Sequence, residues 1–246
     1  KRGDYLNLYT AHDYWLICQQ NNLLKNSSEI CDGGGLCFFC TLRCGRFPQL
    51  WRPMKGFRES VENIDVLIAP SNYVKNKISE NFSVKAVTIP NFVPKPPSHI
   101  KPSGFHNFFL YAGVLEKHKG ILNLIDTFKE VSGKINAKLL IVGTGSLRDE
   151  IREYIKRSEL ETKIILLSWV EHSLLYRLLK DANALIMPSI CPENCPLIAL
   201  EALSVGTPVI ASDKGGIPEI VEKIDKNLIH NSADELKQIL LNFDKR

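Results

Sequence analysis

The chain has 246 residues, of which 44% are hydrophobic and 24% charged, with a formal net charge of +4. This length suits one or two domains with a substantial core, and no apolar run approaches the roughly 18 residues that a membrane-spanning helix needs. All of the charge excess lies in residues 1–97, which hold 12 Lys or Arg against 8 Asp or Glu. An excess this small does not indicate nucleic-acid binding, but it leaves weak contact with an anionic membrane open beside an ordinary solvated surface.

The chain begins without Met and without a recognisable signal peptide, and it enters a strand-like stretch, YLNLYT, at residue 5. We therefore expect a fragment of a longer protein. Without an export signal, the expected location is cytoplasmic, and peripheral contact at the inner face of the membrane is left open.

The first part of the chain predicts an incomplete α/β domain over residues 1–94. Strands are expected at 5–10, 65–69 and 85–89, and helices at 50–63 and 72–81, with a cysteine-rich loop after the first strand. The proline-rich stretch NFVPKPPSHIKPSG follows, which cannot continue a helix or a central strand. It predicts a linker over 95–105, with a second domain over 106–246.

In the second domain, short apolar runs alternate with helical patterns. The expected strands are 108–113, 138–143, 163–168, 184–189 and 208–212, and the expected helices are 119–131, 146–158, 172–181, one from 196, 216–222 and 232–242. Ser146 is the expected cap of its helix. This alternation predicts a parallel sheet with helices on both faces, and hence an α/β fold with two Rossmann-like domains, the N-terminal one incomplete. Ligands are expected at the carboxyl ends of the strands.

The stretch YAGVLEKHKG joins a strand end, a glycine and a helix start. Gly113 ends the strand and lets another backbone or a phosphate approach closely. Lys119 and Gly120 open the next helix, whose free N–H groups favour an anion. Because many α/β proteins have a glycine here, the motif alone leaves both a phosphate site and a plain turn open.

The stretch PENCPLIALEAL carries a carboxylate in an apolar helix. Pro196 suits the first turn of this helix, which is apolar nearly all round and is therefore expected to be buried. Glu201 lies within it and needs partners, because burying an unpaired charge is costly. One interpretation places Glu201 and Glu193 at a diphosphate-binding crevice. The other makes Glu201 a cap of neighbouring backbone and Glu193 an exposed loop residue.

Together these motifs resemble the donor domain of the group 1 retaining glycosyltransferases, which have the two-domain GT-B fold. The signature of that family is a Glu-x7-Glu pair, here Glu193 and Glu201 within PSICPENCPLIALEALSVGTPVIASDKGGIPEIV. Further similar stretches are PSNYVKNKI, IPNFV, LYAGVLEKHKG and LIVGTGSL, so the resemblance covers nearly the whole chain.

The resemblance implies that Glu201 binds the ribose hydroxyls of the nucleotide, so that an empty site would leave its carboxylate short of hydrogen bonds. Glu193 would lie beside the transferred sugar, and Lys119 would neutralise the diphosphate above Gly113. The implied remaining contacts on the donor side are Asn194, Cys195, Leu197 and Ile198 through their backbone N–H groups, Val170 near the base, and Gly143 and Gly145 near the same pocket.

Val114 departs from the family pattern, which commonly has Arg directly after the glycine that matches Gly113. The loss of one charge-assisted contact costs roughly 1–3 kcal/mol of binding to the donor or the transition state. In the first domain, YTAHDYW resembles a strand end whose histidine reaches the donor sugar across the cleft. His12 would take that role, with Asp13 on the acceptor side. A structural histidine is the alternative.

Five of the seven cysteines cluster near the N-terminus, at Cys18, Cys31, Cys37, Cys40 and Cys44. The odd total and the missing export signal favour thiols or a metal over a disulfide framework. The CxxC spacing suits tetrahedral Zn²⁺. Structural zinc on the first four, with Cys44 as a substitute, is the first interpretation; free thiols and disulfides are the others.

The resemblance implies transfer of a hexose or related sugar from a nucleotide-diphosphate sugar, UDP- or GDP-linked, to a glycan or lipid-linked acceptor, with retained anomeric configuration. No metal is required for catalysis, and no nucleic acid is an expected partner. Two alternatives remain: a nucleotide-sugar-binding subunit without catalysis, and a nucleotide-sugar epimerase on the same fold.

Overall fold

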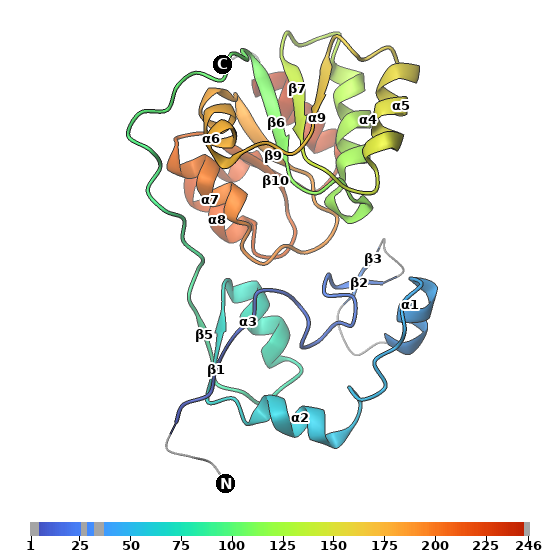
Figure 1. Cartoon of the computed structure of the whole chain (residues 1–246), viewed down its shortest axis with the longest axis vertical. Helices are drawn as coiled ribbons and strands as arrows, with labels where there is room; N and C mark the ends of the chain where they lie inside the picture. The colour runs from blue at the N-terminus through green and yellow to red at the C-terminus, as the bar shows by residue number, and fades with distance from the viewer. Residues whose placement is uncertain (1–4, 26–28, 32–36, 244–246) are drawn as a thin grey trace. The chain divides into compact units, whose positions relative to one another are not determined.

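The computed structural model describes residues 5–25, 29–31 and 37–243 (Figure 1). The chain divides into two compact units. Unit 1 contains Lys1–Asn91, Cys191–Cys195 and Lys214–Glu219, and unit 2 contains Phe92–Ile190, Pro196–Asp213 and Ile220–Arg246. None of the helices that the structure describes is long and apolar enough to cross a membrane.

Unit 1 is built around a three-stranded parallel sheet in the order β1-β4-β5. Its strands are β1 (Leu8–Thr10), β4 (Val66–Ala69) and β5 (Ala86–Thr88), and its longer helices are α2 (Lys55–Glu62) and α3 (Asn72–Ser79). Ser71 caps α3, because its hydroxyl accepts a hydrogen bond from the N–H of Val74 at 3.3 Å. Buried apolar side chains of β4 and α3, including Leu67, Val74 and Ile78, form the core.

The cysteine-rich stretch was predicted as a loop, and that prediction was wrong in part. The stretch contains a short antiparallel pair, β2 (Leu24–Lys25) and β3 (Glu29–Ile30), and a seven-residue helix, α1 (Cys37–Arg43). Helix α1 has no acidic residue in its first turn and consists largely of Cys, Phe and Thr, which are weak helix formers. Its sequence therefore carries no helix signal.

Unit 2 has the predicted α/β architecture, with a six-stranded parallel sheet in the order β11-β10-β9-β6-β7-β8. The strands are β6 (Phe108–Ala112), β7 (Lys138–Val142), β8 (Ile164–Leu167), β9 (Ala184–Met187), β10 (Val209–Ser212) and β11 (Ile229–His230). The side chains of β9 and β10 are buried throughout, as the continuous apolar runs predicted. Strand β11 was not predicted, because two residues give no pattern.

Helices cover both faces of this sheet (Figure 1). They are α4 (Ile121–Val131), α5 (Arg148–Arg157), α6 (His172–Asp181), α7 (Leu197–Ser204), α8 (Pro218–Asp225) and α9 (Ala233–Phe243), with 3₁₀ turns η1 (Lys117–Lys119) and η2 (Lys226–Leu228). Helix α4 packs against α9, and α6 packs against α7. The predicted α6 matches the observed helix residue for residue, and the other predicted helices are confirmed with shifted ends.

Two details of the helix predictions were wrong. Ser146 does not cap α5, whose N-cap position is Leu147 without a side-chain bond, because the Ser146 hydroxyl donates to Glu116 at 2.8 Å. Helix α7 is not buried all round: Ala199 and Ala202 are buried, but Leu197 is 50% exposed. One side of α7 is therefore buried, while part of its apolar surface stays exposed to solvent.

The predicted linker, residues 95–105, contains no helix or strand. Its second half is held by α6. The backbone N–H and the hydroxyl of Ser103 donate to the Asp181 carboxylate at 2.6 and 2.7 Å, and Nε of Arg177 donates to the carbonyl of Lys101 at 3.2 Å. This part of the segment is therefore fixed to unit 2.

Candidate functional site

The strand order of unit 2 places a ligand crevice beside β6. The chain continues from β6 to β7 and β8 on one side, and β9, β10 and β11 lie on the other. Strands β6 and β9 are parallel neighbours, so the segments that follow them leave the same edge of the sheet. Open α/β sheets bind their ligands at such a switch point, outside the carboxyl ends of the strands.

A pocket of about 380 Å³ lies at this edge. It is lined by the carboxyl ends of β6 and β7, by the segment that follows β8, and by side chains of α6 and α7. The predicted site residues that line it are Gly113, Gly143, Val170, Ile198 and Glu201. The structure thus brings half of the predicted donor-side set into one cavity, drawn from four separate segments.

Glu201 has a protein partner inside this pocket. Its Oε1 lies 3.0 Å from Nε2 of His172, and its side chain is 13% exposed against 60% for His172. Glu201 therefore has one protein partner in the empty site, and the sequence did not predict this contact. The partner escaped the sequence reasoning because α7 meets α6 only through tertiary packing, 29 positions apart along the chain.

Tyr176 extends this pair along α6. Its ring meets the ring of His172 edge-on, with 4.8 Å between the centroids. Burial and then the charge of Glu201 raise the pKa of Tyr176, so its hydroxyl keeps its proton at neutral pH. The His172 ring therefore packs against a neutral aromatic side chain.

Packing of the protein itself requires a glycine at some of the glycine positions of the site but not at others. A Cβ on Gly143 would lie 1.9 Å from the carbonyl oxygen of Gly113, and one on Gly145 would lie 2.4 Å from that of Leu115. Those two glycines are needed for the packing of the loops themselves. At Gly113 the nearest atom to a Cβ would be the Tyr111 hydroxyl at an ordinary 3.6 Å. The protein fold does not need a glycine there, which leaves the approach of a ligand as a reason for one.

Two hydrogen-bonded links hold the loops around the pocket. The N–H and hydroxyl of Ser146 donate to the two carboxylate oxygens of Glu116 at 2.9 and 2.8 Å, and these bonds hold the pKa of Glu116 below its usual value. Nη1 of Arg148 donates to the carbonyls of Gly143 at 2.9 Å and Leu167 at 2.8 Å. The ends of β7 and β8 are thereby joined.

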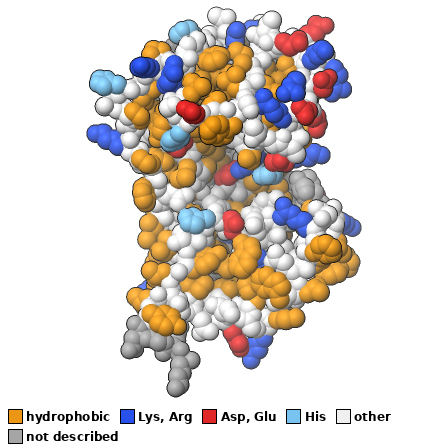
Figure 2. Space-filling view, in the orientation of Figure 1, with side chains coloured by type: hydrophobic (Ala, Val, Ile, Leu, Met, Phe, Trp, Pro, Cys, Tyr) orange, Lys and Arg blue, Asp and Glu red, His pale blue; other side chains and the backbone are white. Residues whose placement is uncertain are grey.

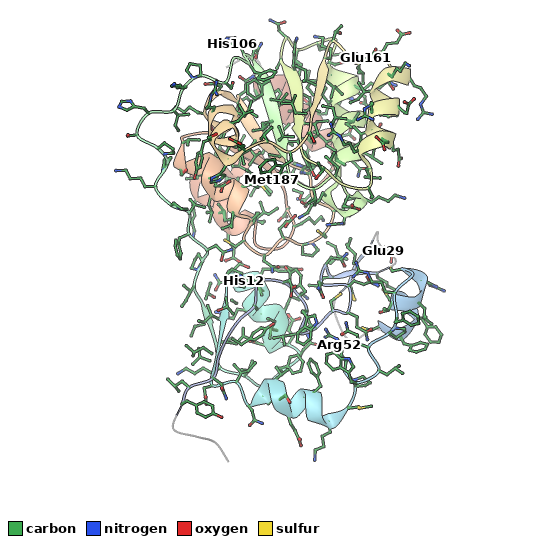
Figure 3. All side chains as sticks on the ribbon, in the orientation of Figure 1. His12, Glu29, Arg52, His106, Glu161 and Met187 are labelled. Carbon is green, nitrogen blue, oxygen red and sulfur yellow. The ribbon has the colours of Figure 1, made fainter. Side chains whose placement is uncertain are left out.

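Lys119, Gly145 and Leu197 lie outside the pocket lining. Lys119 ends η1, next to Gly120, which has φ of 69° and precedes α4. A Cβ on Gly120 would lie 1.9 Å from the carbonyl oxygen of Pro188, just beyond Met187 at the end of β9 (Figure 3). The start of α4 is therefore packed closely against the segment that leads to Glu193.

The loop that carries Glu193, Asn194 and Cys195 belongs to unit 1. The backbone of Glu193 pairs with Gly215 in an isolated parallel bridge, and its carbonyl accepts the N–H of Gly216 at 2.6 Å. A Cβ on Gly215 would lie 2.2 Å from that carbonyl oxygen, which explains the glycine pair in GGIPEIV. The backbone of the Glu193 loop is fixed by these contacts.

His12 and Asp13 lie just after the end of β1 in unit 1, separated from the strand by Ala11 (Figure 3). His12 is exposed. The Asp13 carboxylate accepts the N–H of Trp15 at 2.7 Å, which is a local turn contact with a structural role of its own.

The predicted zinc ligands gather in unit 1 as free thiols. Cys18 is buried, and Cys31, Cys37 and Cys40 are partly buried. Burial and then the neighbouring Cys18, Cys31 and Cys40 raise the pKa of the Cys37 thiol, so each of these three sulfurs lies within electrostatic range of Cys37. Among the residues that the structure describes, no group of three or more metal-binding side chains has the arrangement of a formed site.

Several pocket residues were missed in the sequence, above all His172 and Trp169. Trp169 lies in the segment that follows β8, and His172 begins α6 after it; a polar or aromatic residue between a strand end and the next helix is the signal that could have marked them. Trp169 is 71% exposed, so its indole presents an aromatic surface to solvent.

Comparison with known proteins points to one family. A family model described as glycosyl transferases group 1 matches residues 98–243. A glycosyltransferase of Methanocaldococcus jannaschii that is itself uncharacterised is 30% identical, over 75% of this chain and 51% of its own length. The lipopolysaccharide 1,2-N-acetylglucosaminetransferase of Salmonella typhimurium is 30% identical, over 66% of this chain and 48% of its own. The chain spans about half the length of these curated relatives.

Solved structures show the same fold. A sucrose-phosphate synthase of Thermosynechococcus elongatus has a TM-score of 0.69 at 19% identity, over 98% of this chain and 60% of its own. The S. aureus protein TarM, solved with UDP, has a TM-score of 0.66 at 23% identity, over 82% of this chain and 41% of its own. Since the family match extends over more than half of the sequence, this chain belongs to the group 1 glycosyl transferases.

Proposed function

We propose that the protein transfers a sugar from a nucleotide-diphosphate sugar to a glycan or lipid-linked acceptor, with retention of the anomeric configuration. The observation that carries the donor half is Glu201, a largely buried carboxylate in a 380 Å³ pocket at the switch point of the sheet. Two relatives in the same fold, TarM of S. aureus and HepE of Anabaena, were solved with UDP, the latter also with glucose. UDP is therefore the first donor nucleotide to test, and GDP the second.

The residue roles follow the chemistry of such a donor. Glu201 accepts hydrogen bonds from the ribose hydroxyls, while the exposed indole of Trp169 and the backbone near Val170 serve the base. Helices α4 and α7 begin after neighbouring strands, and their free N–H groups with Lys119 take up the charge that develops on the departing diphosphate. Backbone N–H groups of Asn194, Cys195, Leu197 and Ile198 add further donors, and Glu193 and His12 serve the transferred sugar. None of these steps requires a metal ion.

The acceptor class rests on the named relatives. The Salmonella relative acts on lipopolysaccharide by its name, which supports a glycan or lipid-linked acceptor here. Two alternative functions would use the same pocket. The protein could be a subunit that binds the nucleotide sugar without catalysis, or a nucleotide-sugar epimerase. Val114, where the family commonly has Arg, is the residue that favours weaker catalysis.

Incubation with a radiolabelled UDP-sugar or GDP-sugar tests the proposal. Labelled acceptor, or labelled free sugar from slow hydrolysis, is the expected product. Epimerised donor would support the epimerase, and bound but unchanged donor would support the inactive subunit. Thermal unfolding provides the matched binding readout, because a ligand at 100 times its Kd stabilises the fold by about 2.7 kcal/mol.

A further inference from the structure

The charge of unit 1 is concentrated in one segment. Residues 37–58 hold five Arg or Lys and no Asp or Glu, a formal charge of +5 against +4 for the whole chain. The cations are Arg43, Arg46, Arg52, Lys55 and Arg58. Lys55 and Arg58 form exposed ion pairs with Glu59 and Glu62, the acidic residues just beyond the segment. Of the other three, Arg43 and Arg46 are exposed and Arg52 is partly buried.

The same segment exposes an unusual number of large apolar side chains. Their exposed fractions are Phe38 44%, Phe39 56%, Leu42 48%, Phe47 96%, Leu50 62%, Trp51 42% and Met54 60%. Figure 2 shows hydrophobic side chains gathered on the right of the view, where Figure 1 draws α1 and the segment that leads to α2. Contiguous exposed apolar surface of this kind marks an interaction site. We call residues 37–58 the apolar-basic surface.

A cavity of about 500 Å³ opens within this surface, with Phe38, Leu50 and Met54 in its wall and Arg52 among its polar lining. The guanidinium of Arg52 lies 4.8 Å from the ring centroid of Trp15, and it also lies over the rings of Trp51 and Phe57 (Figure 3). Its Nη1 donates to the carbonyl of Leu16 at 3.1 Å, whereas Nη2 is buried without a hydrogen-bond partner. The cavity therefore combines apolar walls with a cationic donor that is not satisfied.

The combination of apolar and cationic side chains restricts which kind of partner can cover the apolar-basic surface. A protein core that covered the surface would have to bury several cations together with the apolar side chains, which is costly without matching acids. At the surface of a bilayer, Phe, Trp and Leu enter the interface between headgroups and acyl chains while Lys and Arg stay at the anionic headgroups. A bilayer surface therefore accommodates the apolar side chains and the cations at the same time.

We propose that the apolar-basic surface docks onto a bilayer that carries anionic lipid headgroups. The apolar side chains, Phe47 and Leu50 foremost, enter the interface, and Arg43 and Arg46 bind headgroup phosphates. The surface lies on the membrane and does not cross it.

Co-sedimentation with lipid vesicles tests this proposal. Vesicles of equal parts phosphatidylcholine and phosphatidylglycerol are compared with vesicles of phosphatidylcholine alone, each at low and high salt. We expect binding to the anionic vesicles at low salt, and weaker binding at high salt because exposed charges are screened. Equal binding to both compositions, or binding to neither, would overturn the proposal.

Matched variants separate this surface from general charge attraction. One Lys or Arg at an anionic surface contributes about fivefold in partitioning, so the double variant Arg43→Glu, Arg46→Glu should lose more than about tenfold. The control is Lys134→Glu, Lys138→Glu, which makes the same charge change at two exposed lysines of unit 2. An equal loss in this control would show that net charge alone is responsible, against the proposal.

A second pair of variants tests the apolar part. Phe47→Ser, Leu50→Ser removes two side chains that are 96% and 62% exposed, and the control Phe92→Ser, Ile224→Ser removes two that are 87% and 64% exposed. Only the first should lose vesicle binding, with thermal unfolding unchanged in both. If the wild type instead formed a dimer that the first variant dissolved, and vesicles bound neither protein, the surface would be a contact between copies and the proposal would be wrong.

Discussion

Nε2 of His172 lies 3.0 Å from Oε1 of Glu201, so the carboxylate assigned to ribose is oriented by a histidine from the neighbouring helix. The histidine is the more exposed partner, and it lies at the rim where a ligand enters. Under the proposed function, His172 is therefore a positioning residue that acts on the nucleotide through Glu201. The second oxygen of Glu201 stays available for a hydroxyl group.

Removal of His172 should weaken nucleotide binding without unfolding the protein. A hydrogen bond contributes about 0.5–1.5 kcal/mol, so His172→Ala should raise the Kd for UDP by roughly 2- to 12-fold. His172→Gln, which keeps a donor, should recover part of the loss. Titration calorimetry measures both, with His106→Ala, at an exposed position away from the pocket lining, as the control. A Kd for His172→Ala equal to that of the control would remove His172 from the site.

Gly113 offers a test of close ligand approach. A Cβ there meets only the Tyr111 side chain, at an ordinary contact distance of 3.6 Å from its hydroxyl, so Gly113→Ala should leave stability unchanged or raise it slightly. The added methyl group would point into space that a phosphate needs, and the Kd for UDP should rise at least about tenfold. Gly133→Ala is the matched control, because a Cβ at Gly133 meets nothing within 4 Å and the residue lies outside the pocket. Equal affinity in the two variants would count against a diphosphate beside Gly113.

The link between Glu116 and Ser146 should make part of the stability depend on pH. The folded-state pKa of Glu116 is lowered, first by the backbone N–H of Ser146. A lowered carboxylate pKa adds stability that is present above the unfolded-state pKa and is lost as the pH falls through the folded-state value. The wild type should therefore melt above Glu116→Gln at neutral pH, and the difference should disappear in acid. A difference that stayed constant with pH would show that the charge contributes nothing.

The main periodic elements could be predicted from sequence, and so could part of the pocket. Helix α6 was placed to the residue, because Leu and Tyr recur at helical spacing between a strand end and a polar stretch. Gly113, Gly143, Val170, Ile198 and Glu201 meet because parallel strands end at one edge of a sheet. The topology alone was enough to bring these residues together.

What could not be predicted depends on side-chain packing between distant elements. The pairing of His172 with Glu201 requires α6 to lie against α7, and no local pattern encodes that contact. The helix α1 is too short and too rich in Cys and Phe for its propensity to stand out. Ser146 looked like a cap because serine at a helix start commonly caps, whereas its hydroxyl is taken by Glu116 from another loop.

The four gathered thiols lead to a prediction about metal. Protein purified without chelator should carry one Zn²⁺ per chain on Cys18, Cys31, Cys37 and Cys40, which elemental analysis can count. Binding must displace protons from thiols such as Cys37, whose pKa burial raises, so zinc should be released as the pH falls. Cys37→Ser should lose the metal, and Cys191→Ser, far along the chain, should keep it. Metal well below stoichiometry, with all thiols open to titration, would favour free thiols.

Substitution of the two signature glutamates, Glu201 and Glu193, should have different effects on binding and on turnover. Glu201 is assigned to ribose, far from the bond that breaks, so Glu201→Gln should mainly weaken donor binding. The loss of a charge-assisted hydrogen bond costs roughly 1.5–3 kcal/mol, which is about 10- to 150-fold in affinity. Glu193 is assigned to the side of the reacting sugar, so Glu193→Gln should lower turnover more than binding.

Donor Kd from calorimetry and single-turnover rates in the complete enzyme separate the two effects. Glu161→Gln, an exposed glutamate of unit 2 outside the pocket lining, makes the same change as a control and should alter neither quantity. A Glu201→Gln variant that bound normally but turned over slowly would move Glu201 from the ribose to the reacting centre. If both signature variants stayed within twofold of the control in binding and in rate, the carboxylates would be structural, and the donor site proposed here would lose its main support.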